Sequence, residues 1–233
     1  MTPRRGRSSS SAQPKGVRAL GRAGDPAGGA RGPWVQGARR ASPRRAMEAL
    51  LDPAAIGRGL RRIALQIAER GRGVEDLALI GIRRGGEPLA KRLAALLLEI
   101  EGHAPPVGAV DITLYRDDAA TALPNPRIGP SHISFPVDGR RIVLIDDVIY
   151  TGRTIRAALD AVLDYGRPQR IELVALVDRG GRELPIHPDY IVRAVELAPG
   201  QRIDVVERAG ELWALVTAAG TKLSEPPPPP EGT

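Results

Sequence analysis

Two adjacent aspartates end an apolar run in the stretch RIVLIDDVIYTGRTI, residues 141–155, and this stretch constrains the fold more than any other. The run predicts a buried strand over 141–146, and the following residues predict a helix over 153–165. Adjacent carboxylates at the end of a buried strand repel each other and lose solvation. A ligand that uses both groups would offset this cost, so we expect a binding site at this strand-to-helix turn.

The sequence T-G-R-T at 151–154 predicts a phosphate site. A glycine between polar side chains at the start of a helix presents a concave set of backbone N–H donors, which suits phosphate. Asp146 and Asp147 can accept hydrogen bonds from two neighbouring hydroxyls, or hold a divalent cation through water. A phosphate receptor beside a diol receptor matches a ribose 5-phosphate. In the alternative interpretation the acids only cap the helix, which would leave the second aspartate and T-G-R-T unexplained.

Helices and strands alternate along the middle of the chain. Asp52-Pro53 predicts a helix start, with Gly71 and Gly73 closing that helix. A second helix is expected over 87–100. Strands are expected over 77–82, 107–115, 141–146 and 171–177, with further short strands over 186–218. Such alternation predicts an α/β fold with a central parallel sheet covered by helices on both faces. Ligands bind such sheets at the carboxyl ends of the strands.

The two ends of the chain differ from this core in composition. Residues 1–46 carry eleven Lys or Arg and one acid, a balance of +10, whereas the whole chain carries +7, so residues 47–233 sum to −3. We expect a disordered basic extension over 1–46. Three interpretations of this extension are open. It could be a solvated tail without a specific role, the result of a misassigned start site where the true protein begins at Met47, or a functional basic arm. Residues 220–233 predict a disordered proline-rich tail.

Several classes of site are excluded by composition. The chain has no cysteine, which excludes disulfides and thiolate metal sites and fits the cytoplasm. No apolar run approaches the roughly 20 residues that span a membrane. The three histidines are spaced too irregularly for a metal site, and neither the P-loop nor the dinucleotide-binding signature is present.

IVLIDDVIYTGRT at 142–154 resembles the phosphoribosyl-pyrophosphate (PRPP) motif of type I phosphoribosyltransferases. The likeness extends to one subfamily, the PyrR family of pyrimidine-operon regulators that are also uracil phosphoribosyltransferases. It is carried by VDITLYRDD (110–118), DDVIYTGRTIRAALDAV (146–162), YGRP (165–168) and VDRGGRELPIHPDY (177–190). The resemblance covers about residues 50–190. It implies a type I phosphoribosyltransferase domain over 47–219, with a small C-terminal β-rich hood, and Mg²⁺ held mainly through PRPP.

The resemblance also implies roles for particular residues. Asp146 and Asp147 would hold the ribose hydroxyls, and Arg116, in the unpatterned stretch 116–140, would grip pyrophosphate. The other implied site residues are the rest of the PRPP motif (Val148, Ile149, Tyr150, Thr151, Gly152, Arg153, Thr154), a pyrophosphate loop (Arg83, Arg84, Gly85, Gly86) and a base pocket (Val177, Asp178, Arg179). Many relatives have Thr-Arg where this chain has Arg84-Gly85, so the positive charge lies one place earlier.

The expected reaction is uracil plus PRPP giving UMP and pyrophosphate, and the expected partners are these substrates, UMP or UTP and a pyrimidine-operon leader mRNA. Five arginines of the first helix are candidates for RNA contact: Arg58, Arg61, Arg62, Arg70 and Arg72. A solvated helix face explains them equally well. This helix has Leu65 where relatives often carry histidine, and Arg61 in place of a threonine. The alternative function is a phosphoribosyltransferase for uracil or another base without an RNA role. A homodimer or dimer of dimers is expected.

Overall fold

The computed structural model describes residues 39–40, 47–112 and 131–218. All of them belong to the unit that spans 37–233. Arg116, most of the expected N-terminal extension and all of the expected C-terminal tail lie outside the described residues, so the disorder of both ends stays a prediction. None of the described helices is long and apolar enough to cross a membrane.

A parallel sheet forms the centre of the domain, with the order β1-β7-β6-β5-β3-β4. Every neighbouring pair in it is parallel. Its strands are β1 (Arg39–Arg40), β3 (Leu77–Ile82), β4 (Val107–Val110), β5 (Arg141–Ile149), β6 (Arg170–Asp178) and β7 (Tyr190–Glu196). The predicted parallel sheet is therefore confirmed, although β4 ends at Val110, earlier than the strand expected over 107–115.

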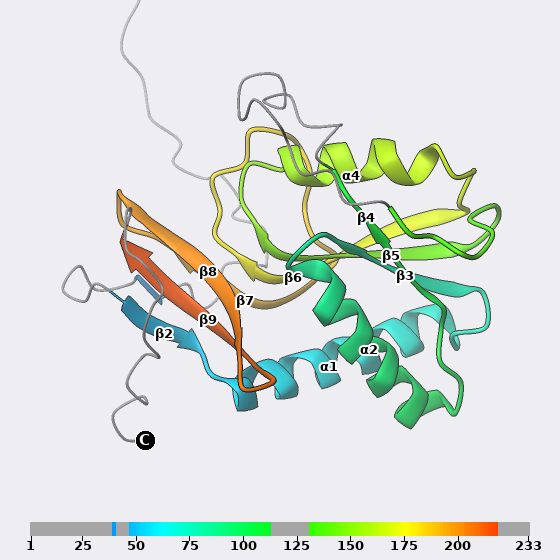
Figure 1. Ribbon diagram of the computed structural model, residues 1–233, viewed down its shortest axis with the longest axis horizontal. Helices are drawn as coiled ribbons and strands as arrows, with labels where there is room; N and C mark the ends of the chain where they lie inside the picture. The colour runs from blue at the N-terminus through cyan, green and yellow to red at the C-terminus, as the bar shows by residue number, and fades with distance from the viewer. Residues whose placement is uncertain (1–38, 41–46, 113–130, 219–233) are drawn as a thin grey trace, which may run out of the picture. The chain divides into compact units, whose positions relative to one another are not determined.

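Helices cover both faces of this sheet, as Figure 1 shows. α1 (Pro53–Gly71) and α2 (Gly86–Glu101) lie on one face, and α4 (Arg153–Leu163) lies on the other. Two apolar cores result. The α1 and α2 side is built on residues such as Ile63 and Leu93, and the α4 side on Ile155 and Leu144. Side chains of β5 alternate between the two cores, because successive residues of a strand point to opposite faces.

The first helix begins and ends close to the predicted residues. The Asp52 carboxylate accepts a hydrogen bond from Ala55 N at 2.6 Å, and Pro53 opens the helix. At the C-terminus, Arg72 rather than a glycine takes the left-handed conformation, with φ 55°. Its backbone N–H reaches the carbonyls of the last turn, and Gly73 follows with φ 114°. The helix ends at Gly71, and Gly73 N donates to Ala68 O at 3.0 Å, so both predicted glycines lie at the helix end, with Arg72 as the C-cap residue between them.

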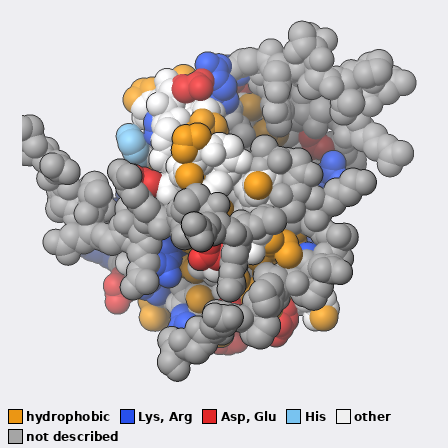
Figure 2. All heavy atoms as spheres, turned by 90° about the vertical axis from the view of Figure 1, so that its left-hand side faces the viewer, with side chains coloured by type: hydrophobic (Ala, Val, Ile, Leu, Met, Phe, Trp, Pro, Cys, Tyr) orange, Lys and Arg blue, Asp and Glu red, His pale blue; other side chains and the backbone are white. Residues whose placement is uncertain are grey.

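A second sheet is antiparallel, with the order β2-β9-β8, and we call it the hood. It consists of β2 (Met47–Leu51), β8 (Gln201–Arg208) and β9 (Glu211–Ala218). The hood was expected from C-terminal residues alone, yet β2 pairs with β9 and supplies one of its three strands. On the side of the molecule that carries this sheet, hydrophobic, basic and acidic side chains are interspersed (Figure 2).

Candidate active site

A cavity of about 350 Å³ opens at the carboxyl ends of β3, β4 and β5. It brings together segments that are far apart in the sequence. Its lining consists of Ile82, Arg83, Arg84, Gly85, Asp111, Ile112, Asp146, Asp147, Val148 and Thr154. Both predicted aspartates, three residues of the predicted pyrophosphate loop and the last residue of T-G-R-T therefore meet in one place, as expected for ligand sites of parallel sheets.

The two aspartates lie within β5 rather than after it, because the strand continues to Ile149. Asp146 is 5% exposed, and its Oδ1 accepts a hydrogen bond from Asp147 N at 3.0 Å. Asp147 Oδ1 accepts one from Val148 N at 2.8 Å. Burial, together with the neighbouring charge of Asp147, raises the pKa of Asp146 well above its ordinary value. The charged form of Asp146 is therefore poorly stabilised by the protein alone, and hydrogen-bond donors or positive charge from a ligand would stabilise it.

The loop after β3 approaches the aspartates without side chains in between. A Cβ at Gly85 would overlap the Asp147 carboxylate, and a Cβ at Gly86 would overlap the Ile145 carbonyl oxygen. Arg83 N donates to Val110 O at 2.9 Å, which places the start of the loop beside the end of β4. Arg83 Nε donates to Glu87 Oε2 at 3.1 Å. Two glycines thus let a basic loop contact the acidic strand end closely.

The T-G-R-T turn forms the start of α4. Gly152 has φ 91°, a left-handed conformation that favours glycine, and it is the N-cap residue of the helix that follows. The backbone carbonyl of Thr151 accepts hydrogen bonds from Glu183 N at 3.0 Å and Leu184 N at 3.1 Å. Arg153 forms an ion pair with Glu183, with Nε and Oε2 2.7 Å apart. The segment 183–184 therefore fixes the turn, and at the start of α4 Arg153 N donates to Thr151 Oγ1 at 3.4 Å, while the N-cap residue Gly152 has no side chain to cap the helix.

The sequence and the fold are similar to those of known proteins. The family profile described as the phosphoribosyl transferase domain matches residues 46–205. The bifunctional protein PyrR of Thermoanaerobacter sp. (strain X514) is 52% identical over 157 residues, which are 67% of this chain and 88% of that relative. The PyrR of Roseiflexus sp. (strain RS-1) is 55% identical over 154 residues, 66% of this chain and 84% of that one. The chain belongs to the PyrR group of the phosphoribosyl transferase family.

Solved phosphoribosyltransferases share the fold at low sequence identity. The hypoxanthine phosphoribosyltransferase of Trypanosoma cruzi, solved in complex with the product IMP, superposes with a TM-score of 0.54 at 18% identity. The match covers 68% of this chain and 84% of that protein. The central sheet and its helices thus follow the phosphoribosyl transferase fold.

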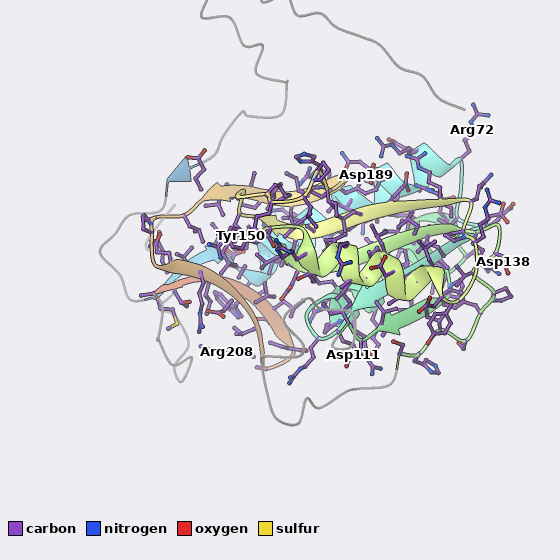
Figure 3. The ribbon with its side chains drawn as sticks, turned by 90° about the horizontal axis from the view of Figure 1, so that it is seen from above. Arg72, Asp111, Asp138, Tyr150, Asp189 and Arg208 are labelled. Carbon is purple, nitrogen blue, oxygen red and sulfur yellow. The ribbon has the colours of Figure 1, made fainter. Side chains whose placement is uncertain are left out.

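The residues predicted for a base pocket lie at the end of β6. Val177 is fully buried in the core, so only its backbone could meet a ligand. Asp178 forms an ion pair with Arg182, with Oδ2 and NH2 2.8 Å apart. The Arg179 guanidinium lies over the Tyr150 ring, 4.0 Å from its centroid. Figure 3 shows Tyr150 between the sheet and the hood. These residues do not line the cavity described above; they lie at the end of β6, the strand next to β5, and their role as a base pocket stays a prediction.

Sequence reasoning missed Asp111 and Ile112, which line the cavity directly after β4. Both lie in VDITLYRDD, the segment that carried the family resemblance, but nothing in the pattern assigned them a role. Asp111 directly follows the end of β4, and an acid at the carboxyl end of a strand of a parallel sheet was the available signal.

The four arginines of α1 and its C-cap residue Arg72 do not form a free basic surface. Arg61 pairs with Glu99 at 3.0 Å, and Arg62 NH2 donates to Ile191 O at 3.1 Å. Arg70 pairs with Asp189 at 3.1 Å and lies 5.3 Å from the centroid of the Tyr190 ring. Arg58 and Arg72 are exposed, and Figure 3 shows Arg72 pointing away from the sheet. The helix therefore offers exposed guanidinium groups near both ends, with internally bonded ones between them.

Proposed function

We propose that this chain transfers a phosphoribosyl group from PRPP to uracil, and that it regulates a pyrimidine operon by binding leader mRNA in response to uridine nucleotides. The observation that carries the transferase activity is the convergence of paired acids, a basic glycine loop and a phosphate-type turn on one cavity. The relatives named bifunctional protein PyrR support two roles for one chain. Both roles would place the protein in the cytoplasm.

PRPP has three parts that correspond to three parts of the site. Asp146 and Asp147 would accept hydrogen bonds from the 2′ and 3′ hydroxyls of the ribose. The backbone N–H groups of 151–154 would bind the 5′-phosphate at the start of α4. Arg83 and Arg84, with the N–H groups of Gly85 and Gly86, would bind the pyrophosphate. The pairing of each subsite with one part of PRPP fixes the direction in which the sugar lies.

The reaction needs positioning and charge stabilisation more than covalent chemistry. The N1 atom of uracil forms a bond to C1′ while the bond from C1′ to the pyrophosphate oxygen breaks, and the N1 proton leaves. Positive charge develops on the ribose, and the carboxylates of Asp146 and Asp147 beside it stabilise that charge. Arg84 stabilises the negative charge of the leaving group. We place Arg116 in the same role, as an expectation for a residue outside the described ranges.

Magnesium fits this cavity as a companion of the substrate. Its acceptors are carboxylates, the ligand type that Mg²⁺ prefers, and Mg²⁺ usually binds through one or two carboxylates plus substrate phosphates. Among the described residues, no group of three or more His, Cys, Asp or Glu side chains could hold a metal ion. Mg²⁺ would neutralise charge on the leaving pyrophosphate, and the protein's residues would orient the complex.

For the regulatory role, the proposed RNA contacts are the exposed arginines of α1 and its C-cap, Arg58 and Arg72 among them. The residues from 47 to 233 carry a net charge of −3, so attraction to RNA must come from a local basic surface. A homodimer or dimer of dimers would place two copies of this helix on one assembly and increase that local charge.

Two measurements test the proposal. Turnover of uracil with PRPP and Mg²⁺, compared with orotate and hypoxanthine, tests the base; faster turnover of another base would show the alternative transferase. Titration of a cognate leader RNA with and without UMP tests regulation. We expect tighter binding with UMP, and binding no tighter than that of an unrelated RNA of equal length would refute the regulatory role.

A further inference from the structure

The segment 178–186, between β6 and β7, packs against the turn that precedes α4. We call this segment the base loop, because it begins with the predicted base-pocket residues. Arg179 N donates to Ile149 O at 3.1 Å, and the Arg179 guanidinium lies over the ring of Tyr150, which Figure 3 labels. A Cβ at Gly181 would overlap the same ring. The base loop therefore contacts the residues that lead into the T-G-R-T turn.

Arg182 joins the base loop to this turn with all three nitrogens of its guanidinium group. NH1 donates to the backbone carbonyl oxygen of Tyr150 at 2.6 Å. NH2 pairs with Asp178 Oδ2 at 2.8 Å, and Nε donates to Ile186 O at 2.8 Å. The Arg182 side chain is only 12% exposed. One partner thus lies directly before Thr151, and the other two lie at the two ends of the base loop.

A nucleotide has to be held by its 5′-phosphate and by its base at the same time. The T-G-R-T turn is the proposed phosphate site, and the base loop carries the predicted base pocket. The separation of these two segments decides whether one molecule can reach both of them. A planar guanidinium group suits this task, because its donors point in fixed directions toward several acceptors, which the single ammonium group of lysine does not achieve.

We propose that Arg182 is a positioning residue that holds the T-G-R-T turn and the base loop at the separation that a uridine nucleotide requires. It acts through the backbone of Tyr150 and the side chain of Asp178. This inference rests on the proposed transferase function and adds a residue that couples its two binding segments. Loss of Arg182 therefore weakens ligands that span both segments more than ligands that occupy one.

The test compares the binding of two ligands by calorimetry in the wild type and in Arg182→Gln. UMP would reach both segments, whereas ribose 5-phosphate would reach only the T-G-R-T turn and the two aspartates of β5. We expect the affinity for UMP to fall about tenfold more than the affinity for ribose 5-phosphate, the size of a typical coupling between two sites. A residue that only supports folding would lower both affinities equally.

Turnover of uracil gives a second readout. Misplacement of a substrate by a distant substitution can cost about a hundredfold in rate, and we expect a loss of that order in kcat for Arg182→Gln. The KM for PRPP should change much less, because PRPP also binds through its pyrophosphate group. Arg182→Lys keeps the charge beside Asp178 and should therefore retain more of the melting temperature, yet it should still weaken UMP more than ribose 5-phosphate.

Arg92→Gln is the matched control. Arg92 NH2 also donates to a backbone carbonyl at 2.6 Å, that of Gly210, and it joins α2 to the hood without lining the cavity. Its affinities for both ligands should equal those of the wild type. Equal losses for the two ligands in both Arg182 variants, or an equal preference lost in Arg92→Gln, overturn the inference and leave the transferase function intact. A wild-type protein that binds neither ligand overturns both.

Discussion

Gly85 lies directly against the carboxylate of Asp147, so that a Cβ at this glycine would overlap the carboxylate oxygen. Its backbone has φ −71° and ψ −33°, a conformation open to any residue. Space, not backbone freedom, thus requires glycine here. The contact joins the proposed pyrophosphate loop after β3 to the proposed diol receptor of β5.

Gly85→Ala should therefore damage binding and stability together. The added methyl group must displace Asp147 or the loop, and overpacking of this kind costs about 1–3 kcal/mol. We expect a lower free energy of unfolding in urea and weaker binding of PRPP. Gly57→Ala is the control, since Gly57 lies in α1 with no atom within 4 Å of an added Cβ. It should raise the free energy of unfolding by about 0.5–1 kcal/mol. Equal effects of the two substitutions would contradict the packing argument.

Asp146→Asn should stabilise the fold while it abolishes PRPP binding. The folded protein raises the pKa of Asp146, so the folded state holds this proton more tightly than the unfolded chain. The contribution to stability is therefore present at acidic pH and is lost as pH rises through the raised pKa. The amide of the Asp146→Asn side chain would not ionise, so the variant avoids the free-energy cost of a buried negative charge at higher pH. Its melting temperature should therefore rise relative to that of the wild type as pH increases. Melting curves from pH 4 to 8 for both proteins provide the measurement. If the melting temperature of the variant minus that of the wild type fell as pH increased, the pKa of Asp146 would be lowered by folding and the prediction would be wrong.

Glu172→Ala should be far more destabilising than removal of a surface acid. Glu172 is 1% exposed and pairs with Arg141 at 2.7 Å and Arg170 at 2.8 Å. Its removal leaves the largely buried Arg141 charge uncompensated. We expect the free energy of unfolding to fall by about 3–5 kcal/mol, the typical cost of breaking a buried ion pair. Urea denaturation measures it.

The control for this ion pair is Asp160→Ala, which breaks the exposed pair with Arg156 on α4, at 3.2 Å. Such pairs contribute about 0.3–0.5 kcal/mol. A loss for Glu172→Ala as small as that of the control would show that Arg141 finds other partners without difficulty.

Combined Arg58→Ala and Arg72→Ala should weaken binding of leader RNA and leave uracil turnover unchanged. Each lost phosphate contact should lower the slope of log affinity against log salt by about one unit. Arg156→Ala removes the same charge as Arg58→Ala alone, but from α4 on the other face of the sheet, and should leave the affinity for RNA as it is. If this control reduced affinity equally, the effect would be one of net charge rather than of α1.

The local sequence predicted the central sheet and the diol receptor because their signals are local. An apolar run, a pair of acids and a glycine-containing turn lie within fifteen residues. The end of β5 was predicted at 146, three residues too early, because two adjacent carboxylates are typical of the end of a buried strand. Pairing with β6 as far as Ile149 and Asp178 continues the strand instead. Periodicity carries no information about such pairing.

Two other features depend on contacts between distant residues. β2 has no alternating pattern, and its place in the hood is set by pairing with β9, more than 160 residues later in the chain. Asp111 is a single acid after a short strand, and only the folded sheet brings it to the cavity that Asp146 lines. In both cases tertiary structure, not local propensity, decides the outcome.

The hood also bears on how the protein is made. β9 is its middle strand and the last described element, and it must be synthesised before β2 and β8 have a common partner. Until then β2 presents unpaired backbone groups next to the first helix, a state that invites pairing with other chains. On the nascent chain, β2 therefore has no partner strand in the hood until β9 has been synthesised. A premature stop anywhere before Glu211 would produce an aggregation-prone fragment rather than a smaller enzyme.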